Sequence, residues 1–435
     1  MLTAKYVRDN LEAIRKSLEK RKSDFPLDDL LKYDEEARKL ITRIQQMRAE
    51  RNKGSLEVAE LKKKGEEPSK EQLESLAKLK EQIDAEEKQL EEYNKKLKAL
   101  LWSMPNILHD SVPYGKDDTE NVEVRRWGTP KEKQPLSHID ILQKMGLVDL
   151  ERAAKVAGAR FYYLRGEIVK LSLALEQFAL DFLYKKGYVP VLPPFMIKRE
   201  HYEGVTSLAD FEDALYAVTE SGEAKSKQDI EHMTEPMFLI STSEHAIAAM
   251  HAGEIFSKSD LPLKYAGIST CFRREAGAHG KDTKGIFRVH QFDKVEQFIF
   301  TKEDDSWQYF EEMVKNEEEM FQKLGIPYRV VDICTGDIGI VAAKKNDVEG
   351  WFPSQGKYRE LTSASNCTVW QSMRLDIRYD DNGERKYVHT LNGTGIAVER
   401  TIAAIVENYY DASTNTIKIP DVLVPYMQKD AITQS

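Results

Sequence analysis

The segment from Cys271 to Phe298, CFRREAGAHGKDTKGIFRVHQFDKVEQF, carries residue types suited to binding a nucleotide. Two apolar, strand-like runs flank a charged, glycine-rich loop, with Arg273 in the first run and Arg288 at the start of the second. Guanidinium groups hold phosphate oxygens with two parallel hydrogen bonds. Phe292 offers an aromatic face for a base, and Glu275 offers a carboxylate for an exocyclic amine. A charged surface hairpin without a ligand would explain the same residues.

Two common nucleotide-binding signatures are absent from the sequence. It contains no glycine loop ending in Gly, Lys and Ser or Thr, and no glycine pattern of the dinucleotide-binding type. Any nucleotide binding must therefore depend on another arrangement of residues.

The first 105 residues are predicted to form a domain of their own, because their composition differs from the remainder. They are rich in Glu, Lys, Leu and Gln, and their apolar residues repeat in heptads, as in the series Leu30, Ala37 and Ile44. A similar series runs from Leu76 to Met104, and the intervening link KKKGEEPSK contains turn-forming Gly and Pro. We predict a long antiparallel coiled-coil hairpin over residues 1–105.

Cationic residues gather toward the tip of this predicted hairpin. Phosphate binding requires a local excess of Lys and Arg, whereas the net charge of the whole chain, −9, argues against indiscriminate binding of nucleic acid. An oligomerising coiled coil would explain the heptads without any RNA. The candidate RNA-binding residues are Arg43, Arg48, Arg51, Lys53, Lys62, Lys63 and Lys64.

A linker rich in turn formers is expected at 106–134, followed by a second domain at 135–435. There, patterns such as LKYAGIST, QFIF, YRVVDI and MRLDIRY predict strands, and FEDALYAV and IAVERTIAAIVENYY predict helices. Strands outnumber crossover helices, so we predict an α+β fold with a mixed, mainly antiparallel sheet flanked by helices. The stretch 207–237 is charged and irregular, and it receives no assignment.

The remaining composition indicates a cytoplasmic protein. No run of about 20 apolar residues is present, and the N-terminal residues follow an amphipathic helical pattern unlike that of a signal peptide. The widely spaced Cys271, Cys334 and Cys367 have neither zinc-site nor disulfide spacing, so we expect buried thiols.

Three segments together carry a family resemblance. The segment around Arg273 resembles motif 2 of the class II aminoacyl-tRNA synthetases, KKGYVPVLPPFM resembles motif 1, and LNGTGIAVERTIAAIVENYY resembles motif 3. TSE at 242–244, RELTSASNCT at 359–368 and HTLNGTG at 389–395 are similar to the seryl-tRNA synthetase family in particular. The hairpin also resembles that family's tRNA-binding arm, so the resemblance covers essentially the whole chain.

The resemblance implies an ATP site. Arg273, the implied catalytic residue, would hold the α-phosphate and the amino acid carboxylate, and Arg288 and Arg400 would bind the distal phosphates. Phe292 would stack on adenine and Glu275 would read its amino group. The implied ATP-binding residues are Arg273, Arg274, Glu275, Arg288, Val289, Phe292, Glu360, Leu361, Thr362, Ser363 and Arg400.

The resemblance also implies a magnesium site and a serine pocket. Glu360 and Ser363 would share Mg²⁺ with the triphosphate. Without the motifs, Glu360 could equally pair with Arg359, and Glu296 could equally neutralise Lys294. The implied serine-binding residues are Thr242, Ser243, Glu244, Arg273, Glu296, Asn392 and Thr394.

The implied activity is ATP-dependent activation of L-serine and its transfer to serine tRNA, and to selenocysteine tRNA where present. A homodimer is expected, because motif 1 builds a twofold interface in this class. Three alternatives stay open: an enzyme of the same fold for threonine, glycine or alanine, a relative that binds without catalysis, and an amino acid ligase for carrier proteins.

Overall fold

The computed structural model describes residues 2–207, 214–218, 237–275 and 284–434. The chain divides into two compact units, Met1–Met104 and Pro105–Ser435. The segment expected to be a linker, 106–134, contains strand β1 (Val122–Trp127), which pairs with β11 (Tyr328–Asp332). This segment therefore contributes an edge strand to the main sheet of the second unit.

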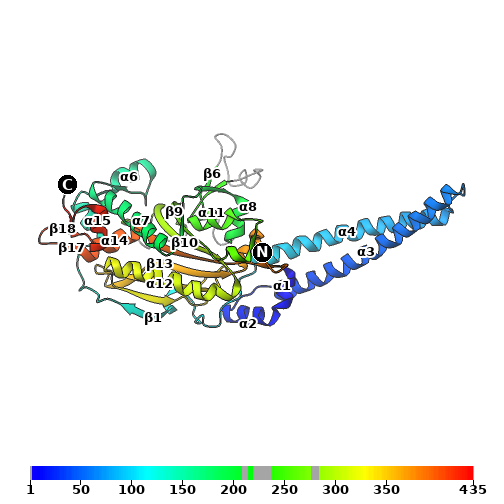
Figure 1. Ribbon diagram of the computed structural model, residues 1–435, viewed down its shortest axis with the longest axis horizontal. Coiled ribbons are helices and arrows are strands. Elements are labelled where there is room, and N and C mark those ends of the chain that lie inside the picture. Colours follow the sequence, from blue (N-terminus) through cyan, green and yellow to red (C-terminus); the bar gives the residue numbers. More distant parts are fainter. Residues whose placement is uncertain (1, 208–213, 219–236, 276–283, 435) are drawn as a thin grey trace. The chain divides into compact units, whose positions relative to one another are not determined.

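The first unit consists of helices joined by short connections (Figure 1). Two short helices, α1 (Ala4–Asp9) and α2 (Leu11–Arg21), precede α3 (Leu27–Lys63) and α4 (Lys70–Ser103). The long helices contain 37 and 34 residues, which at about 1.5 Å per residue gives arms of roughly 50 Å or slightly more. They run back along each other as a coiled-coil hairpin, which confirms the predicted fold of this region.

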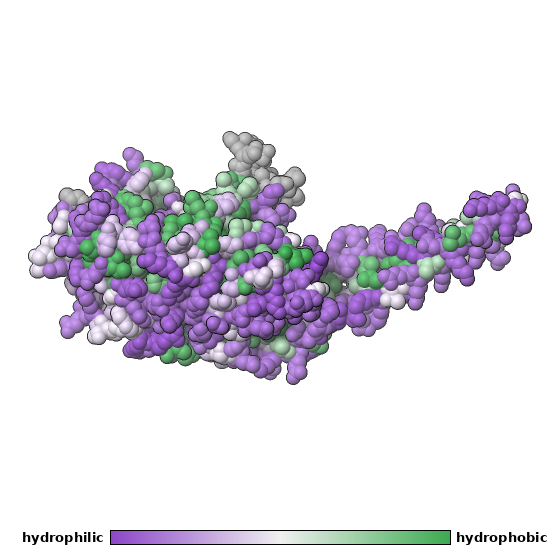
Figure 2. Space-filling view, viewed as in Figure 1, coloured by the Kyte–Doolittle hydropathy of each residue, from purple (hydrophilic) through white to green (hydrophobic). Residues whose placement is uncertain are grey.

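The hairpin is held by a narrow apolar seam. Leu40, Ile44 and Ile83 are buried between the two helices, and the rings of Tyr33 and Tyr93 meet with centroids 5.9 Å apart. Figure 2 shows hydrophilic side chains over most of the remaining hairpin surface. At the turn, α4 begins with a capping box in which Ser69 and Gln72 satisfy each other's backbone N–H groups. Sequence periodicity and capping chemistry therefore agree on this element.

The second unit is built on an eight-stranded sheet with the order β1-β11-β12-β13-β16-β10-β9-β4. Every neighbouring pair is antiparallel except β4 and β9, which are parallel, so the predicted mixed and mainly antiparallel sheet is confirmed. Besides β1 and β11, the sheet contains β12 (Lys344–Phe352), β13 (Lys357–Thr368), β16 (His389–Ala397), β10 (Gln291–Thr301), β9 (Leu263–Phe272) and, at its other edge, β4 (Val189–Val191).

Helices cover both faces of this sheet. On one face α7 (Glu167–Lys185), α12 (Ser306–Leu324) and α14 (Val398–Tyr409) enclose the main core, to which β10 contributes Val295 and Ile299. Phe298 and Phe300 of β10 point the other way and pack with residues of α11 (Ser243–Met250) and α13 (Trp370–Leu375). Because side chains alternate along a strand, the even-numbered positions of β10 lie on the face that carries α11.

Smaller elements complete the second unit. The helices are α5 (His138–Lys144), α6 (Leu150–Ala157), α8 (Arg199–Val205) and α15 (Val424–Met427). The strands are β2 (Val148–Asp149), β3 (Tyr163–Leu164), β5 (Met196–Lys198), β6 (Ala217–Val218), β7 (Met237–Leu239), β8 (Ile255–Ser257), β14 (Arg378–Asp381), β15 (Glu384–Tyr387), β17 (Tyr410–Asp411), β18 (Thr416–Lys418) and β19 (Ala431–Ile432). No helix in the described ranges is long and apolar enough to cross a membrane.

Two predictions of secondary structure were wrong in part. In FEDALYAV, predicted as a helix, Ala217 and Val218 form β6 and pair with β7, while residues 211–213 lie outside the described residues. In MRLDIRY, predicted as one strand, the first residues end α13 and the strand starts at Arg378. Asp376 separates the two with a left-handed backbone, φ 56°, which closes the helix. Most of the unassigned stretch 207–237 also lies outside the described residues.

Candidate active site

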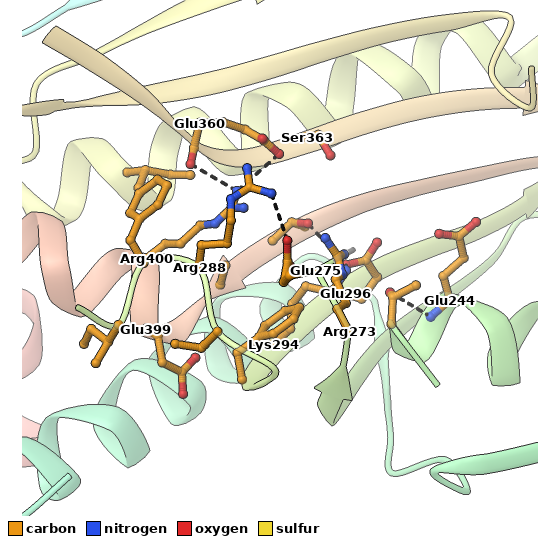
Figure 3. Close-up of a pocket in the computed structure, with 18 of the residues that line it drawn as sticks. Glu244, Arg273, Glu275, Arg288, Lys294, Glu296, Glu360, Ser363, Glu399 and Arg400 are labelled. Carbon is orange, nitrogen blue, oxygen red and sulfur yellow. Dashed lines mark hydrogen bonds and ion pairs between the residues drawn. The ribbon is translucent and has the colours of Figure 1, made fainter. Parts of the chain in front are cut away.

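One cavity on the sheet collects most of the residues predicted to bind ATP and serine (Figure 3). Its walls come from β10, β13 and β16, the N-terminus of α11, the end of β9 and the first turn of α14. The predicted residues that line it are Thr242, Glu244, Arg273, Glu275, Arg288, Val289, Phe292, Glu296, Glu360, Leu361, Ser363, Asn392, Thr394 and Arg400. Residues more than 150 positions apart in the sequence thus meet in one place.

Two β-bulges aim side chains into this cavity. Glu360 and Ser363 are three residues apart and would face opposite sides of a regular strand. In the pairing of β12 with β13, Thr362 lies opposite Val348 but Glu360 lies opposite Glu349, so Leu361 is an extra residue. The bulge at Leu361 therefore brings both Glu360 and Ser363 to the cavity.

A second bulge lies in the neighbouring strand β16. Glu296 pairs with Thr394 while Val295 pairs with Ile396, which leaves Gly395 as the extra residue. Thr394 and Ala397, again three apart, consequently both line the cavity. An isolated glycine in a strand pattern is a sequence signal for such a bulge, but Leu361 gives no comparable signal.

The end of the cavity lined by Glu244 and Glu296 contains a buried ion pair between Glu296 and Lys294, a residue that the predicted site did not include. Lys294 Nζ lies 2.6 Å from Glu296 Oε2, and the two side chains are only 7% and 3% exposed. Thr394 Oγ1 also donates to Glu296 Oε2, at 3.3 Å. Glu296 does pair with Lys294, as the alternative interpretation of the sequence expected. Both residues nevertheless line the cavity.

Glu244 is the second carboxylate at this end. Its Oε1 accepts hydrogen bonds from Gln371 Nε2 at 2.7 Å and from Asn392 Nδ2 at 3.1 Å. Burial, together with the nearby Glu296, raises the pKa of Glu244 to about 7. Gln371, on α13, is fully buried and was not found from the sequence, because nothing in its local pattern connects it with position 244.

Thr242 and Ser243 occupy different positions relative to the cavity. The Thr242 side chain accepts a hydrogen bond of 3.2 Å from the Glu244 backbone N–H, which fixes the start of α11. Ser243, predicted as a serine-binding residue, is fully buried and donates to the Gly267 carbonyl on β9 at 3.3 Å. Its side chain packs against the sheet and does not line the cavity.

The part of the cavity lined by Arg288 and Arg400 carries two arginine–carboxylate pairs. Arg288 donates to Glu275 at 2.9 Å, and Arg400 lies 3.3 Å from Glu360. Burial alone would raise the pKa of Glu360, but the nearby cations Arg400, Lys345 and Arg273 lower it to about 2. Arg359, which the sequence offered as the partner of Glu360, instead donates to Gln355 at 2.7 Å.

Arg273 and Glu275 have distinctive local geometry. The Arg273 guanidinium lies over the Phe292 ring, 5.1 Å from its centroid. Glu275 has a left-handed backbone with φ 48°, which is unusual for a residue with a side chain. Such conformations persist where the surrounding structure holds them, and they cluster at functional sites.

Two predicted ATP-binding residues do not line the cavity. The Thr362 hydroxyl donates to Glu317 Oε2 on α12 at 2.9 Å, on the opposite face of the sheet. Arg274 is exposed, and its backbone N–H donates to the Ala214 carbonyl. Any contact of Thr362 with a nucleotide would thus have to come from its backbone.

The cavity also contains lining residues that sequence reasoning missed. Glu399 accepts hydrogen bonds from the Tyr162 hydroxyl and from the Asp293 backbone N–H. Burial, together with Asp293, raises the pKa of Glu399 to about 8. The sequence signal that could have identified Glu399 is its position next to Arg400 in motif 3. The other missed residues are Ile286, Phe287, Lys294 and Ala397.

The oxygens of Glu360 and Ser363 suit a magnesium ion that also binds a triphosphate. Mg²⁺ takes oxygen ligands and is often bound by one or two carboxylates plus substrate phosphates. No group of three or more His, Cys, Asp or Glu that could hold a metal is found in the part of the chain that the structure describes.

The seven predicted tRNA-binding residues of the hairpin form two groups. Arg48 lies 2.6 Å from Glu87, and Arg43 lies 3.4 Å from Glu86, so these two bridge α3 and α4. The other five have no ion pair within the described residues, and four of them are exposed: Lys53, Lys62, Lys63 and Lys64.

The sheet, its three motifs and the cavity define a class II aminoacyl-tRNA synthetase. In agreement, residues 226–409 match the family described as the tRNA synthetase class II core domain for G, H, P, S and T. Residues 1–108 match the seryl-tRNA synthetase N-terminal domain.

Individual relatives are similar over nearly their whole length. The serine–tRNA ligase of Methanocella arvoryzae is 48% identical over 98% of this chain and 99% of its own. The crystal structure of Pyrococcus horikoshii seryl-tRNA synthetase complexed with ATP matches with a TM-score of 0.91 and 46% identity, covering all of both chains. The cytoplasmic serine–tRNA ligase of Naegleria fowleri in complex with AMP gives 0.86 and 38%, covering 98% and 96%. The chain belongs to the seryl-tRNA synthetase family, the serine–tRNA ligases.

Proposed function

We propose that the cavity performs both steps of serine attachment: formation of seryl adenylate from L-serine and ATP, and transfer of the seryl group to the 3′ end of serine tRNA. The observation that supports this most directly is the meeting of two ligand environments in one cavity. Glu244 and Glu296 lie at one end, where Thr394 bonds Glu296, and Arg288, Arg400 and Glu360 lie at the other, with Arg273 between them.

In the first step, one carboxylate oxygen of serine bonds to the α-phosphorus of ATP. The bond from that phosphorus to the oxygen bridging toward the β-phosphorus breaks, and its electron pair leaves with pyrophosphate. In this proposal Arg273 holds the carboxylate and the α-phosphate and stabilises the charge that develops between them. No side-chain nucleophile is required, because positioning of the two substrates supplies much of the rate.

The adenine would stack on Phe292, with Glu275 accepting from its amino group and the backbone near Val289 and Arg274 closing the pocket. Arg288 and Arg400 would bind the distal phosphates. Both arginines are now paired with carboxylates, at 2.9 and 3.3 Å, so ATP would replace Glu275 and Glu360 as their partners.

Glu360 and Ser363 would hold Mg²⁺ together with the triphosphate. Magnesium supplies charge neutralisation of the phosphates when it is bound. The low pKa of Glu360 supports this assignment, because the carboxylate stays ionised at any physiological pH.

Selection of serine would depend on buried polar groups. The serine ammonium would lie between Glu244 and Glu296, and its hydroxyl would reach the pocket closed by Asn392 and Thr394. A site built to hydrogen-bond a hydroxyl rejects alanine, because its own polar groups are then left unsatisfied. Threonine is the sharper competitor, since it keeps the hydroxyl and adds a methyl group.

The hairpin would bind the variable arm of serine tRNA. Support comes from the exposed cations near its turn, Lys53, Lys62, Lys63 and Lys64, which offer phosphate contacts without first breaking an ion pair. Arg51 would join them, whereas Arg43 and Arg48 would have to exchange Glu86 and Glu87 for phosphate. Charging of selenocysteine tRNA, and a cytoplasmic location, remain part of this proposal.

A homodimer would form through the apolar surface of α7 and β4. Strand β4 lies at the end of the sheet order. Large apolar side chains on and beside these elements are exposed: Leu173 by 60%, Tyr184 by 66%, Val189 by 55% and Leu192 by 76%. An exposed apolar group of this kind at a sheet edge is typical of a protein–protein interface.

The experiment that tests the proposal is pyrophosphate exchange with ATP, magnesium and each of the twenty amino acids in turn, without tRNA. Exchange with serine alone would support the assigned pocket. Exchange with threonine, glycine or alanine would contradict the pocket but not the fold, and no exchange with any amino acid would favour the binding-only alternative.

A further inference from the structure

Helix α12 packs against the face of the sheet opposite the cavity, and two consecutive polar residues lie in the middle of this contact. Asn316 and Glu317 are both 0% exposed. They interrupt an otherwise apolar face of the helix, whose other residues belong to the main core: Met313, Val314, Met320 and Phe321. Burying a polar group costs free energy unless the group is hydrogen-bonded, so the partners of these two residues indicate their role.

Glu317 bonds the strand that carries the proposed magnesium ligands. Its Oε2 accepts the hydrogen bond of 2.9 Å from the Thr362 hydroxyl. Thr362 lies between Leu361, the extra residue of the β13 bulge, and Ser363, which lines the cavity. A Cβ added at Gly393 on β16 would lie 3.0 Å from Glu317 Oε1, so the carboxyl group also packs closely behind that strand. The hydrogen bond to Thr362 thus ties the helix to β13 within the bulge.

Asn316 bonds β10 in a similar way. Its Nδ2 donates to Gln297 Oε1 at 2.8 Å and to the Tyr188 hydroxyl at 3.4 Å. Gln297 Nε2 in turn donates to the Met313 carbonyl of α12 at 3.3 Å. Because side chains alternate along a strand, Glu296 faces the cavity while the next residue, Gln297, faces the helix. Asn316 therefore holds the neighbour of a proposed serine ligand.

We infer that Asn316 and Glu317 are positioning residues, each serving one end of the cavity. This inference rests on the proposed function. A bulge interrupts the regular ladder of a sheet, so its direction depends on contacts from outside the ladder. Glu317 fixes the β13 bulge through Thr362, and with it the direction of the proposed magnesium ligands. Asn316 fixes β10 through Gln297, and with it the direction of Glu296.

Two kinds of variant separate the hydrogen bond of Glu317 from its packing. Burial raises the pKa of Glu317 well above its ordinary value, and three nearby carboxylates act in the same direction: Asp347, Glu296 and Glu318. The uncharged carboxyl form is therefore favoured, and Glu317→Gln keeps both the lack of charge and an acceptor for Thr362. Glu317→Leu with Thr362→Val removes both partners, keeps apolar packing behind the strand and leaves no buried hydroxyl unsatisfied.

The first measurement is binding of the Mn²⁺–ATP complex without serine, followed by the relaxation of water protons, with Mn²⁺ as a paramagnetic probe in place of Mg²⁺. We expect Glu317→Leu with Thr362→Val to raise the half-saturating concentration at least about fivefold. Glu317→Gln and Asn316→Leu should stay within about twofold of the unmodified protein, as should every variant for ATP with the metal chelated. Gln322→Leu, which removes another hydrogen bond from α12, 2.8 Å long and directed to Tyr328 on β11, is the matched control and should change neither constant.

The second measurement is the KM for serine in pyrophosphate exchange at saturating Mg²⁺ and ATP. Here the order reverses: Asn316→Leu should raise this KM at least about fivefold, and Glu317→Leu with Thr362→Val should leave it within about twofold. Thermal unfolding of each variant records any loss of stability. A merely structural role would lower the melting temperature and move both constants together, or move neither, and either result would overturn the inference.

The proposed function can fail separately from this inference. If the unmodified protein binds Mn²⁺–ATP but does not activate serine, the proposed function fails and the assignment of Asn316 is overturned with it. The metal measurement then still decides the role of Glu317, because that measurement requires no turnover. Loss of Mn²⁺–ATP binding in Glu317→Gln equal to that in the double variant would overturn the assignment of Glu317.

Discussion

Gln371 Nε2 lies 2.7 Å from Glu244 Oε1 and donates to it from the buried side of the proposed serine pocket. The orientation of this amide is fixed, because Gln371 Oε1 accepts from the Thr390 hydroxyl at 2.6 Å. Gln371 does not line the cavity, so it would act on serine only through Glu244.

We therefore expect Gln371→Ala to raise the KM for serine about tenfold, as for loss of a buried hydrogen bond to a charged group, while the KM for ATP stays nearly constant. The pH profile distinguishes positioning from a general structural effect. Because the pKa of Glu244 is about 7, the KM for serine should fall as pH rises from 6 to 8 and the carboxylate ionises. Loss of the Gln371 donor removes a group that favours the ionised form, so the midpoint should move upward. An unchanged midpoint would mean that Gln371 only stabilises α13 and does not position Glu244.

Arg273→Ala should reduce the rate of serine-dependent pyrophosphate exchange by about a hundredfold or more, corresponding to loss of about 3 kcal/mol of transition-state stabilisation. Arg273→Lys should recover only part of this, because lysine cannot hold the carboxylate and the phosphate with one planar group. Circular dichroism checks that both variants fold. Exchange at the unmodified rate in Arg273→Ala would refute its catalytic role.

Glu360→Gln should raise the Mg²⁺ concentration for half-maximal exchange at least about tenfold, since Mg²⁺ strongly prefers a charged oxygen ligand. Ser363→Ala should produce a smaller rise. At saturating Mg²⁺ both variants should recover much of their activity. An identical Mg²⁺ dependence in all three proteins would place the metal elsewhere.

Leu173→Glu combined with Leu192→Glu should convert the proposed dimer to a monomer in sedimentation at micromolar concentration, because two charges would then be buried on each side of the interface. Val156→Glu, at an equally exposed apolar residue on α6, serves as the control and should leave the dimer intact. A monomeric unmodified protein would contradict the assignment of this surface.

Replacement of Lys62, Lys63 and Lys64 by glutamate should raise the KM for tRNA more than tenfold and flatten its dependence on salt. Serine-dependent exchange without tRNA should remain unchanged, because the hairpin forms a separate unit. Arg43→Gln with Arg48→Gln should have the weaker effect, since these residues are engaged with Glu86 and Glu87. Equal effects of the two sets would mean that the ion pairs open at no cost when tRNA binds.

The hairpin and the antiparallel sheet could be predicted from the sequence because their signals are local. Heptad spacing fixes which faces of α3 and α4 meet, and alternation fixes the strands β9, β10 and β11. The prediction failed where packing against a neighbouring element determined the secondary structure. Met373–Leu375 alternate like a strand, but they form the end of α13, which packs against the sheet.

The site could be predicted less completely, because a motif gives residue types but not directions. Thr362 and Ser363 are adjacent in the sequence, yet the first bonds Glu317 behind the sheet and the second lines the cavity. Lys294 and Gln371 were missed for a related reason. Their partners, Glu296 and Glu244, are recognisable, but the contacts themselves depend on burial and on the approach of α13.

The extra residues at Leu361 and Gly395 give the site an unequal tolerance of genetic change. Each bulge accommodates one extra residue, so loss of the codon for Leu361 would leave Glu360 and Ser363 two positions apart, on the same face of a regular strand. Insertion of a further codon at this place would instead turn the residues beyond it to the opposite face. For protein engineers, the same feature means that grafting the side chains onto a regular sheet would not transplant the site, because the irregular backbone itself has to be copied.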